Sequence, residues 1–162
     1  MTYSVVVSIS KQTLDVIDSA SLTPVKSYVI STGLNGIGCD KGSGKTPLGH
    51  HIIRAKIGHD QPLNSVFVGR RPTGEVYSPG LANVQLNRDW ILTRILWLSG
   101  TQVGVNRLGQ VDTMQRYIYI HGTPDSEPMG IPLSHGCIRM RNQDIMELFD
   151  LVEVSTPVEI IC

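Results

Sequence analysis

A mostly β fold in one domain, covering residues 1–162, is what the sequence predicts. The chain is 162 residues long and 41% hydrophobic, which suffices for one hydrophobic core. Its apolar residues fall mainly in short runs rich in β-branched side chains and bounded by turn formers, a pattern typical of strands. A single segment near the C-terminus repeats its apolar residues at helical spacing instead. We therefore expect a set of strands with one main helix packed on them.

Three antiparallel strands are predicted near the N-terminus. Residues 3–10 and 11–18 are short β-branched segments in which apolar and polar side chains partly alternate. Residues 18–21 form a turn signal, and residues 24–32 provide the third run. Consecutive short strands joined by turns predict an antiparallel meander.

Residues 33–49 predict a long loop. They include six glycines and almost no large apolar side chains. A loop of this length in a compact domain is usually functional or mobile. Its segment GSGKT, residues 42–46, resembles part of a phosphate-binding loop, but the pattern GxxxxGK[ST] requires glycine where this chain has Cys39. A strand-like run follows in place of a helix, so we do not expect a nucleotide site.

Four further apolar runs predict the strands of the middle of the chain. They are residues 51–57, 65–69, 90–99 and 117–121, the last with His121 at its C-terminal end. The run 90–99 fits a strand or a short helix, and its Ile, Thr and Trp content favours a strand. Residues 70–89 are polar and rich in turn formers, and we expect them to make an excursion over the surface.

One helix is predicted to begin near Asn142, which fits an N-cap. Asp144 and Glu147 place negative charge near its N-terminal end. Apolar side chains then recur at spacing i, i+3, i+4 and i+7, at Ile145, Leu148, Phe149 and Val152. Residues 158–161 return to a strand.

Charge and hydropathy exclude several classes of protein. Fourteen basic and fourteen acidic residues give a formal charge of zero, which argues against a nucleic-acid partner. No run of eighteen apolar residues is present, so no membrane span is predicted. The first residues carry neither a basic segment nor a small-residue cleavage site. We therefore expect a cytoplasmic protein, or a periplasmic one if the chain is a trimmed mature form.

Cys137 is the cysteine whose neighbours indicate chemistry. The three cysteines are odd in number and widely spaced, which predicts neither a disulfide framework nor a CxxC zinc site. His121 and His135 each offer an imidazole that can take the thiol proton, and Arg139 adds positive charge that favours the thiolate. Gly136 allows a tight turn with exposed N–H groups, as an oxyanion requires. These residue types predict acyl transfer through a thioester.

A lowered pKa of Cys137 is part of this prediction. The thiolate is the reactive form of a cysteine, and the imidazoles and the guanidinium are expected to favour it. Cys137 should then be alkylated faster at neutral pH than Cys39 in the glycine-rich loop or Cys162 at the chain end.

A zinc site is the alternative that uses the same side chains. His121, His135 and Cys137 would supply three ligands and leave one position open. The nearby carboxylates, Asp125 and Glu127, lie in a predicted turn, so nothing is expected to orient the imidazoles. We therefore expect neither a metal nor a cofactor.

Two motifs resemble the active-site signature of the YkuD-type L,D-transpeptidases. They are IHGT, residues 120–123, and SHGCIRM, residues 134–140. The segments VVVSISKQTLDVID and PVKSYVIST, the loop ending GSGKTPLG and the final helix and strand match the layout of that family. The resemblance covers nearly the whole chain, least closely over residues 70–99. It implies a β-sandwich-like catalytic domain.

The resemblance also implies a reaction. Family members attack the bond after the third residue of a peptidoglycan stem peptide, commonly meso-diaminopimelate followed by D-alanine, and an amine or water resolves the thioester. Cys137 is similar to the nucleophile and His121 to its proton acceptor. The backbone carbonyl of Gly122 is similar to the group that orients the imidazole. Acylation by carbapenems is expected as well.

The remaining motif residues are assigned to the oxyanion site and the substrate. Ser134, His135 and Gly136 are similar to the residues that shape the oxyanion site, with the N–H groups of Gly136 and of the cysteine as donors. Arg139 is assigned to a substrate carboxylate, since a guanidinium pairs well with carboxylates. Thr123 and Ser134 are assigned to substrate binding.

The expected acceptor is water. Without a predicted export segment, the expected reaction is that of an L,D-carboxypeptidase that removes terminal D-alanine from tetrapeptide stems in muropeptide recycling. Its partners would be muropeptides or nucleotide-linked precursors. Alternatives are an L,D-transpeptidase that forms 3-3 cross-links or exchanges D-amino acids, and a non-catalytic domain that binds stem peptides.

Overall fold

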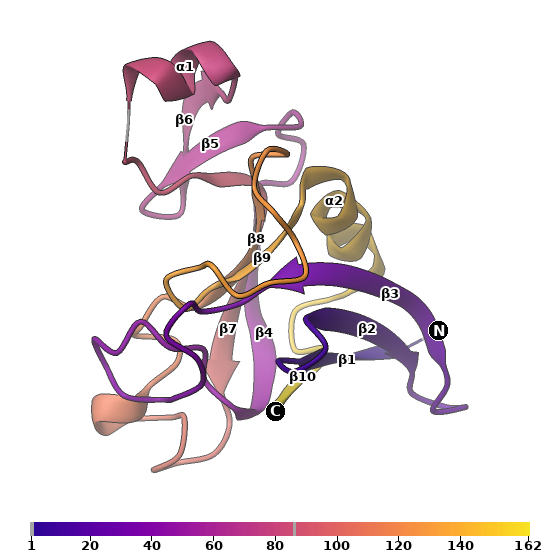
Figure 1. Ribbon diagram of the computed structural model, residues 1–162. Coiled ribbons are helices and arrows are strands. Elements are labelled where there is room, and N and C mark those ends of the chain that lie inside the picture. Colours follow the sequence, from indigo (N-terminus) through magenta and orange to yellow (C-terminus); the bar gives the residue numbers. More distant parts are fainter. Residues whose placement is uncertain (1, 86) are drawn as a thin grey trace.

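The computed structural model describes residues 2–85 and 87–162 (Figure 1). Ten strands form one sheet in the order β4-β10-β1-β2-β3-β9-β8-β7-β5-β6. The strands are β1 (Tyr3–Ser8), β2 (Thr13–Asp18), β3 (Pro24–Ser31), β4 (Gly49–Ile57), β5 (Ser65–Val68), β6 (Arg71–Val76), β7 (Ile91–Gly100), β8 (Tyr119–Thr123), β9 (Ile138–Arg141) and β10 (Pro157–Ile161). The helices are α1 (Pro79–Val84), the 3-10 helix η1 (Gly109–Val111) and α2 (Asn142–Leu151). The predicted mostly β fold with one main helix near the C-terminus is confirmed.

Strand β4 closes the sheet upon itself. It pairs antiparallel with β10 on one side and with β7 on the other. The strands from β4 round to β7 therefore surround a common interior, and β5 and β6 extend the sheet beyond β7. The predicted meander is confirmed, because β1–β2 and β2–β3 are both antiparallel.

Helix α2 packs against β7, β8 and β9, and Figure 1 shows it above β3. Its predicted apolar stripe is confirmed, since Ile145, Leu148 and Phe149 are buried in the main core with side chains from β1, β2, β3, β7, β8, β9 and β10. The opposite side of α2 is tied to β3 through Glu147, which accepts a hydrogen bond from Tyr28 Oη at 2.6 Å. No helix among the described residues is long and apolar enough to cross a membrane.

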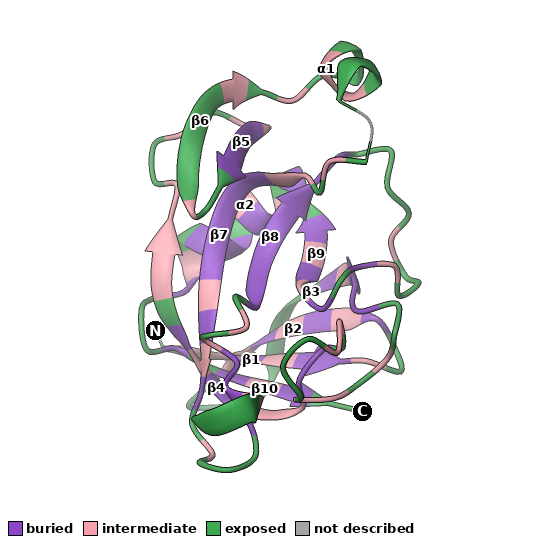
Figure 2. Ribbon diagram, turned by 90° about the vertical axis from the view of Figure 1, so that its left-hand side faces the viewer, coloured by how far each residue is buried: buried purple, intermediate pink, exposed green. Residues whose placement is uncertain are grey.

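The stretch 70–89 is more regular than the sequence indicates. It contains the edge strand β6 and the helix α1, both largely exposed (Figure 2). Pro72 and Gly74 hide the strand pattern of β6, and such residues are tolerated at a sheet edge. The start of α1 has a proline in its first turn after Ser78, whose Oγ accepts a hydrogen bond from Leu81 N at 3.2 Å.

Candidate active site

Two parallel strands, β8 and β9, bring the motif residues to one face of the sheet. Ile120 lies opposite Ile138, and His121 lies opposite Arg139. Ile120 and Ile138 are fully buried in the main core. Because side chains alternate along a strand, His121 and Arg139 point to the other side, which we call the outer face. Cys137 immediately precedes β9 and packs against the apolar cluster of this outer face.

Backbone groups of the chain leading into β8 hold the thiol of Cys137. Its Sγ accepts a hydrogen bond from Tyr119 N at 3.3 Å. It donates one to Tyr117 O at 3.4 Å. Both partners are main-chain atoms, so no side chain in the sequence indicates them.

His121 has a defined tautomer. Its imidazole is buried, and Nδ1 lies 2.6 Å from Gly122 O. A carbonyl oxygen only accepts, so Nδ1 carries the proton and Nε2 is left as the basic nitrogen. This is the contact that the resemblance implies for Gly122. His121 lies in the middle of β8, and the predicted position at the C-terminal end of a strand is wrong.

Close packing around Gly122 positions this carbonyl. A Cβ at position 122 would lie 2.6 Å from Leu92 O and would also collide with the side chain of Asn142. The Asn142 amide is buried and donates to Thr123 O at 2.8 Å, while its oxygen accepts from Thr93 Oγ1 at 2.6 Å. The predicted N-cap role of Asn142 is therefore wrong. Arg141 occupies the N-cap position, and Asn142 joins the helix start to β7 and β8.

The segment 134–137, here called the cysteine loop, is braced by Ser134. The Ser134 hydroxyl donates to Cys137 O at 2.6 Å and accepts from Gly136 N at 3.2 Å. The N–H of Gly136 is thus engaged within the loop, in contrast to its expected role as an oxyanion donor. Gly136 has φ +120°, and a Cβ there would lie 3.1 Å from Lys45 O, so only glycine suits this turn.

The glycine-rich loop, residues 33–49, packs against the cysteine loop. Leu34 N donates to Ser134 O at 2.9 Å, and Thr46 Oγ1 donates to Gly136 O at 2.9 Å. Arg116 fastens the loop from the other side, with Nη2 2.6 Å from Lys45 O. The glycine-rich loop therefore forms one wall of the site rather than a simple connection between strands.

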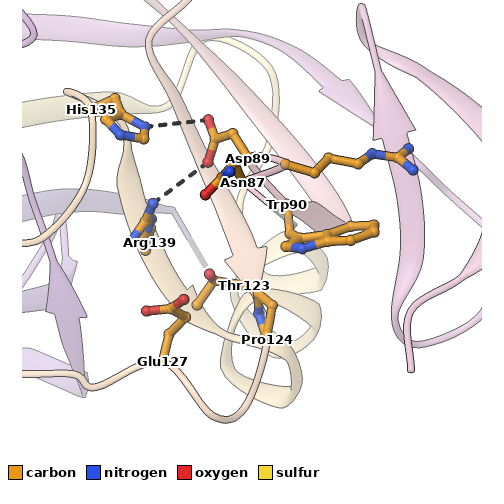
Figure 3. A pocket seen from close by; sticks show the side chains of 9 residues that line it. Asn87, Asp89, Trp90, Thr123, Pro124, Glu127, His135 and Arg139 are labelled. Atoms are coloured by element: carbon orange, nitrogen blue, oxygen red, sulfur yellow. Dashed lines mark hydrogen bonds and ion pairs between the residues drawn. The ribbon is translucent and has the colours of Figure 1, made fainter. Parts of the chain in front are cut away.

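A cavity of about 350 Å³ opens beside Arg139 (Figure 3). Its lining is Asn87, Arg88, Asp89, Trp90, Thr123, Pro124, Glu127, His135 and Arg139. The side chain of His135 is 75% exposed and faces Asp89, with Nδ1 3.7 Å from Oδ2. His121 is consequently the imidazole held in the sheet on the same face as Cys137, and His135 belongs to the cavity wall.

Comparisons with known proteins identify the family to which this chain belongs. The family model YkuD, the L,D-transpeptidase catalytic domain, matches residues 2–160. The chain belongs to this family. Two probable L,D-transpeptidases of Escherichia coli strain K12 match the YkuD domain described here over 46 residues, YbiS at 48% identity and ErfK/SrfK at 52%. The matched segment is 28% of this chain and only 15% of either relative.

Solved structures match the YkuD domain over nearly its whole length. The L,D-transpeptidase from Mycobacterium smegmatis superposes with a TM-score of 0.56 at 18% identity, covering 99% of this chain and 58% of that one. LD transpeptidase LdtMt1 in complex with imipenem gives a TM-score of 0.57 at 22% identity, covering 99% and 59%. At these identities the likeness shows the fold, and this chain spans less than two thirds of those chains.

The resting thiol of this YkuD domain differs from the expected one. Burial raises the pKa of Cys137 to about 11, and the charge of Asp89 raises it further. The Tyr119 N–H and the guanidinium groups of Arg139 and Arg116 oppose the rise only in part. Burial also lowers the pKa of His121. The predicted low thiol pKa is therefore wrong, and at neutral pH the folded chain holds a neutral thiol and a neutral imidazole on the same face of the sheet.

Slow alkylation of Cys137 at neutral pH is the expected consequence. Because burial raises the pKa of Cys137 to about 11, almost none of its thiol is ionised at pH 7. Iodoacetamide should modify the exposed Cys162 before Cys137, and the Cys137 rate should climb until the pH passes about 11. Peptide mapping by mass spectrometry measures both rates. Preferential modification of Cys137 at pH 7, with a plateau below pH 8, would contradict this.

Metal binding was the alternative for the same residues. Among residues 2–85 and 87–162, no group of three His, Cys, Asp or Glu side chains lies close enough to hold a metal ion. His121 is buried in the sheet, whereas His135 points to solvent and to Asp89.

Proposed function

We propose that this chain is a cysteine-dependent L,D-carboxypeptidase that removes terminal D-alanine from the tetrapeptide stems of peptidoglycan fragments. The observation that carries the proposal is the outer face of β8 and β9. There the thiol of Cys137, an imidazole of defined tautomer and the guanidinium of Arg139 lie together. Membership of the YkuD family supports acyl transfer as the reaction class.

The neutral pair of Cys137 and His121 accounts for both half-reactions. As Sγ attacks the carbonyl carbon after the third stem residue, its proton passes to His121 Nε2. The tetrahedral intermediate then collapses to a thioester, and the departing D-alanine amine takes the proton from the imidazole. Water attacks the thioester with His121 again as base, which releases the tripeptide acid and restores the thiol.

The guanidinium of Arg139 assists by its charge and its contacts. Its side chain is only 11% exposed, and its positive charge lowers the pKa of Cys137 against the effect of burial. We assign Arg139 to a substrate carboxylate, a pairing that guanidinium geometry favours. Thr123 lies at the wall of the same cavity and is assigned to the bound peptide. The N–H of Cys137 is assigned to the oxyanion.

Water is the acceptor that the open edge of the site favours. The imidazole of His135, within the cysteine loop, is exposed, so solvent reaches this edge. Soluble muropeptides or nucleotide-linked precursors are the donors in this proposal, and muropeptide recycling in the cytoplasm is the process it would serve. Transfer to an amine, as in cross-linking or D-amino acid exchange, is the second candidate. The acidic side chains of Asp89 and Glu127 in the cavity favour it, because carboxylates attract a cationic amine.

The products distinguish water from an amine as acceptor. We expect a disaccharide-tetrapeptide to yield disaccharide-tripeptide and free D-alanine in equal amounts, measured by liquid chromatography and mass spectrometry. The Cys137→Ala variant serves as the blank. A predominance of cross-linked dimer would contradict the carboxypeptidase and leave acyl transfer intact.

A further inference from the structure

The cavity beside Arg139 carries unbalanced charge. Two carboxylates, those of Asp89 and Glu127, line it together with the guanidinium of Arg139 (Figure 3). The second guanidinium, that of Arg88, is already neutralised, because Nη2 lies 2.9 Å from Glu75 Oε1. Negative charge therefore exceeds positive charge at the surface that a ligand would meet.

The charged groups of this cavity are only loosely paired. Asp89 Oδ1 lies 3.5 Å from Arg139 Nη2, and Asp89 Oδ2 lies 3.7 Å from His135 Nδ1. Charge-assisted hydrogen bonds are usually about 2.7–2.9 Å long. Among the residues that the structure describes, the Glu127 carboxylate has no hydrogen bond or ion pair. These groups can therefore take closer partners from a ligand.

The cavity adjoins the reacting groups. Arg139 lies opposite His121 in the paired strands, and His135 belongs to the cysteine loop. The charge of Asp89 acts on both members of the pair, since it raises the pKa of His121 and that of Cys137. A ligand in the cavity therefore lies beside Arg139 and the cysteine loop, on the face of the sheet that carries His121 and Cys137.

A ligand with charges of both signs fits this cavity best. A carboxylate alone would meet Arg139 but also the repulsion of Asp89 and Glu127. An ammonium alone would meet the carboxylates but also the repulsion of Arg139. The head group of an α-amino acid carries an ammonium and a carboxylate on one carbon, so it can pair with both signs at once. A volume of about 350 Å³ accommodates such a group.

We propose that this cavity binds the zwitterionic head group of an α-amino acid, with its ammonium at Asp89 and Glu127 and its carboxylate at Arg139. Asp89 is then a specificity-determining residue. The proposal rests on the function proposed above, because that function determines which molecule can carry the head group. The head group belongs either to the free end of a diamino acid in the third stem position or to an amino acid that accepts the acyl group.

Direct binding to the Cys137→Ala protein tests the chemistry without turnover. D-alanine carries both charges, D-lactate lacks the ammonium and ethylamine lacks the carboxylate. In an NMR titration we expect D-alanine to bind at least about tenfold more tightly than either analogue, the effect of one partly buried ion pair. Asp89→Asn, added to Cys137→Ala, should weaken D-alanine binding by about tenfold. Glu153→Gln, at the exposed turn after α2, is the matched control.

Two results of this titration would overturn the proposal. Equal affinity for D-alanine and D-lactate would show that no ammonium is recognised. Tighter binding of D-alanine by the Asp89→Asn variant would show that Asp89 competes with a ligand carboxylate for Arg139. The titration requires no catalysis. Either result would therefore not contradict the proposed reaction, and failure to detect the reaction would not contradict the titration.

Kinetics with otherwise native enzyme identify the source of the head group. If it belongs to the donor, Asp89→Asn should reduce the preference for diaminopimelate over lysine or over the side-chain amide in the third stem position. If it belongs to an acceptor, Asp89→Asn should reduce the ratio of D-amino acid exchange to hydrolysis. Either change supports the proposal. If neither ratio changed in a variant that still hydrolysed the substrate, the proposal would be refuted.

Discussion

Replacement of His121 by alanine is expected to reduce kcat/KM for a tetrapeptide muropeptide by about 10²–10⁴-fold, the usual contribution of a positioned general base. The thiol proton would have no acceptor, and the high pKa of Cys137 leaves almost no thiolate to react without one. Release of D-alanine under subsaturating substrate measures the effect. His59→Ala, at an exposed position in the connection between β4 and β5, is the matched control. Activity within tenfold of wild type would remove His121 from the reaction.

The pH dependence of kcat/KM should also reflect a buried, neutral His121. Burial lowers the pKa of His121 below its usual 6.5, so the imidazole stays neutral and basic as the pH falls through that value. We therefore expect kcat/KM to hold at pH 6.5 and to fall only in more acidic solution. An acidic limb centred above 6.5 would contradict a buried neutral base.

Replacement of Gly122 by alanine should lower the free energy of unfolding strongly. The added Cβ would lie 2.6 Å from the backbone oxygen of Leu92, an atom within β7 that cannot move aside. It would also displace the Asn142 side chain and its hydrogen bonds to Thr93 and Thr123. We expect a loss of about 3 kcal/mol or more, and hence a Tm lowered by about 6–12 °C.

Gly80→Ala is the control for this change. A Cβ on Gly80 would meet only Ser78 Oγ, at 3.8 Å, so its effect should stay within about 0.5 kcal/mol. Thermal unfolding followed by circular dichroism compares the two variants. Equal Tm values for both would contradict the close packing of Gly122 between β7 and Asn142.

Strand and helix patterns explain how much of the fold is predictable. The alternating runs near the N-terminus and the apolar stripe of α2 reflect which side chains the core takes up, and burial of those side chains confirms both. Strand β9 was not predicted, because it is only four residues long. Its alternating apolar residues, Ile138 and Met140, lie within the cysteine motif, which was interpreted as a reactive site. Strand β6 is exposed, so no buried face shapes its sequence.

The candidate site could be located from the sequence where distinctive side chains belong to it. Cys137, His121 and Arg139 are recognised by type and spacing, and the parallel pairing of β8 and β9 brings them together. Tyr119 N and Tyr117 O are backbone contacts, which side-chain types do not reveal.

Charge and burial at the site depend on the fold. Asp89 lies fifty residues before Arg139 in the chain, and only the folded chain brings the two together. The direction of the Cys137 pKa was wrong because neighbouring charges are visible in a sequence, whereas burial against the apolar cluster of the outer face is not.

Covalent modification of Cys137 tests the central claim most directly. We expect a carbapenem such as imipenem to acylate this protein once, at Cys137, through opening of its lactam ring. Intact-mass spectrometry should show one adduct of the full imipenem mass on the wild type and on the Cys39→Ala and Cys162→Ala variants. The Cys137→Ala variant should show none. An adduct that persists on Cys137→Ala, or the absence of any adduct on the wild type, would contradict Cys137 as the nucleophile.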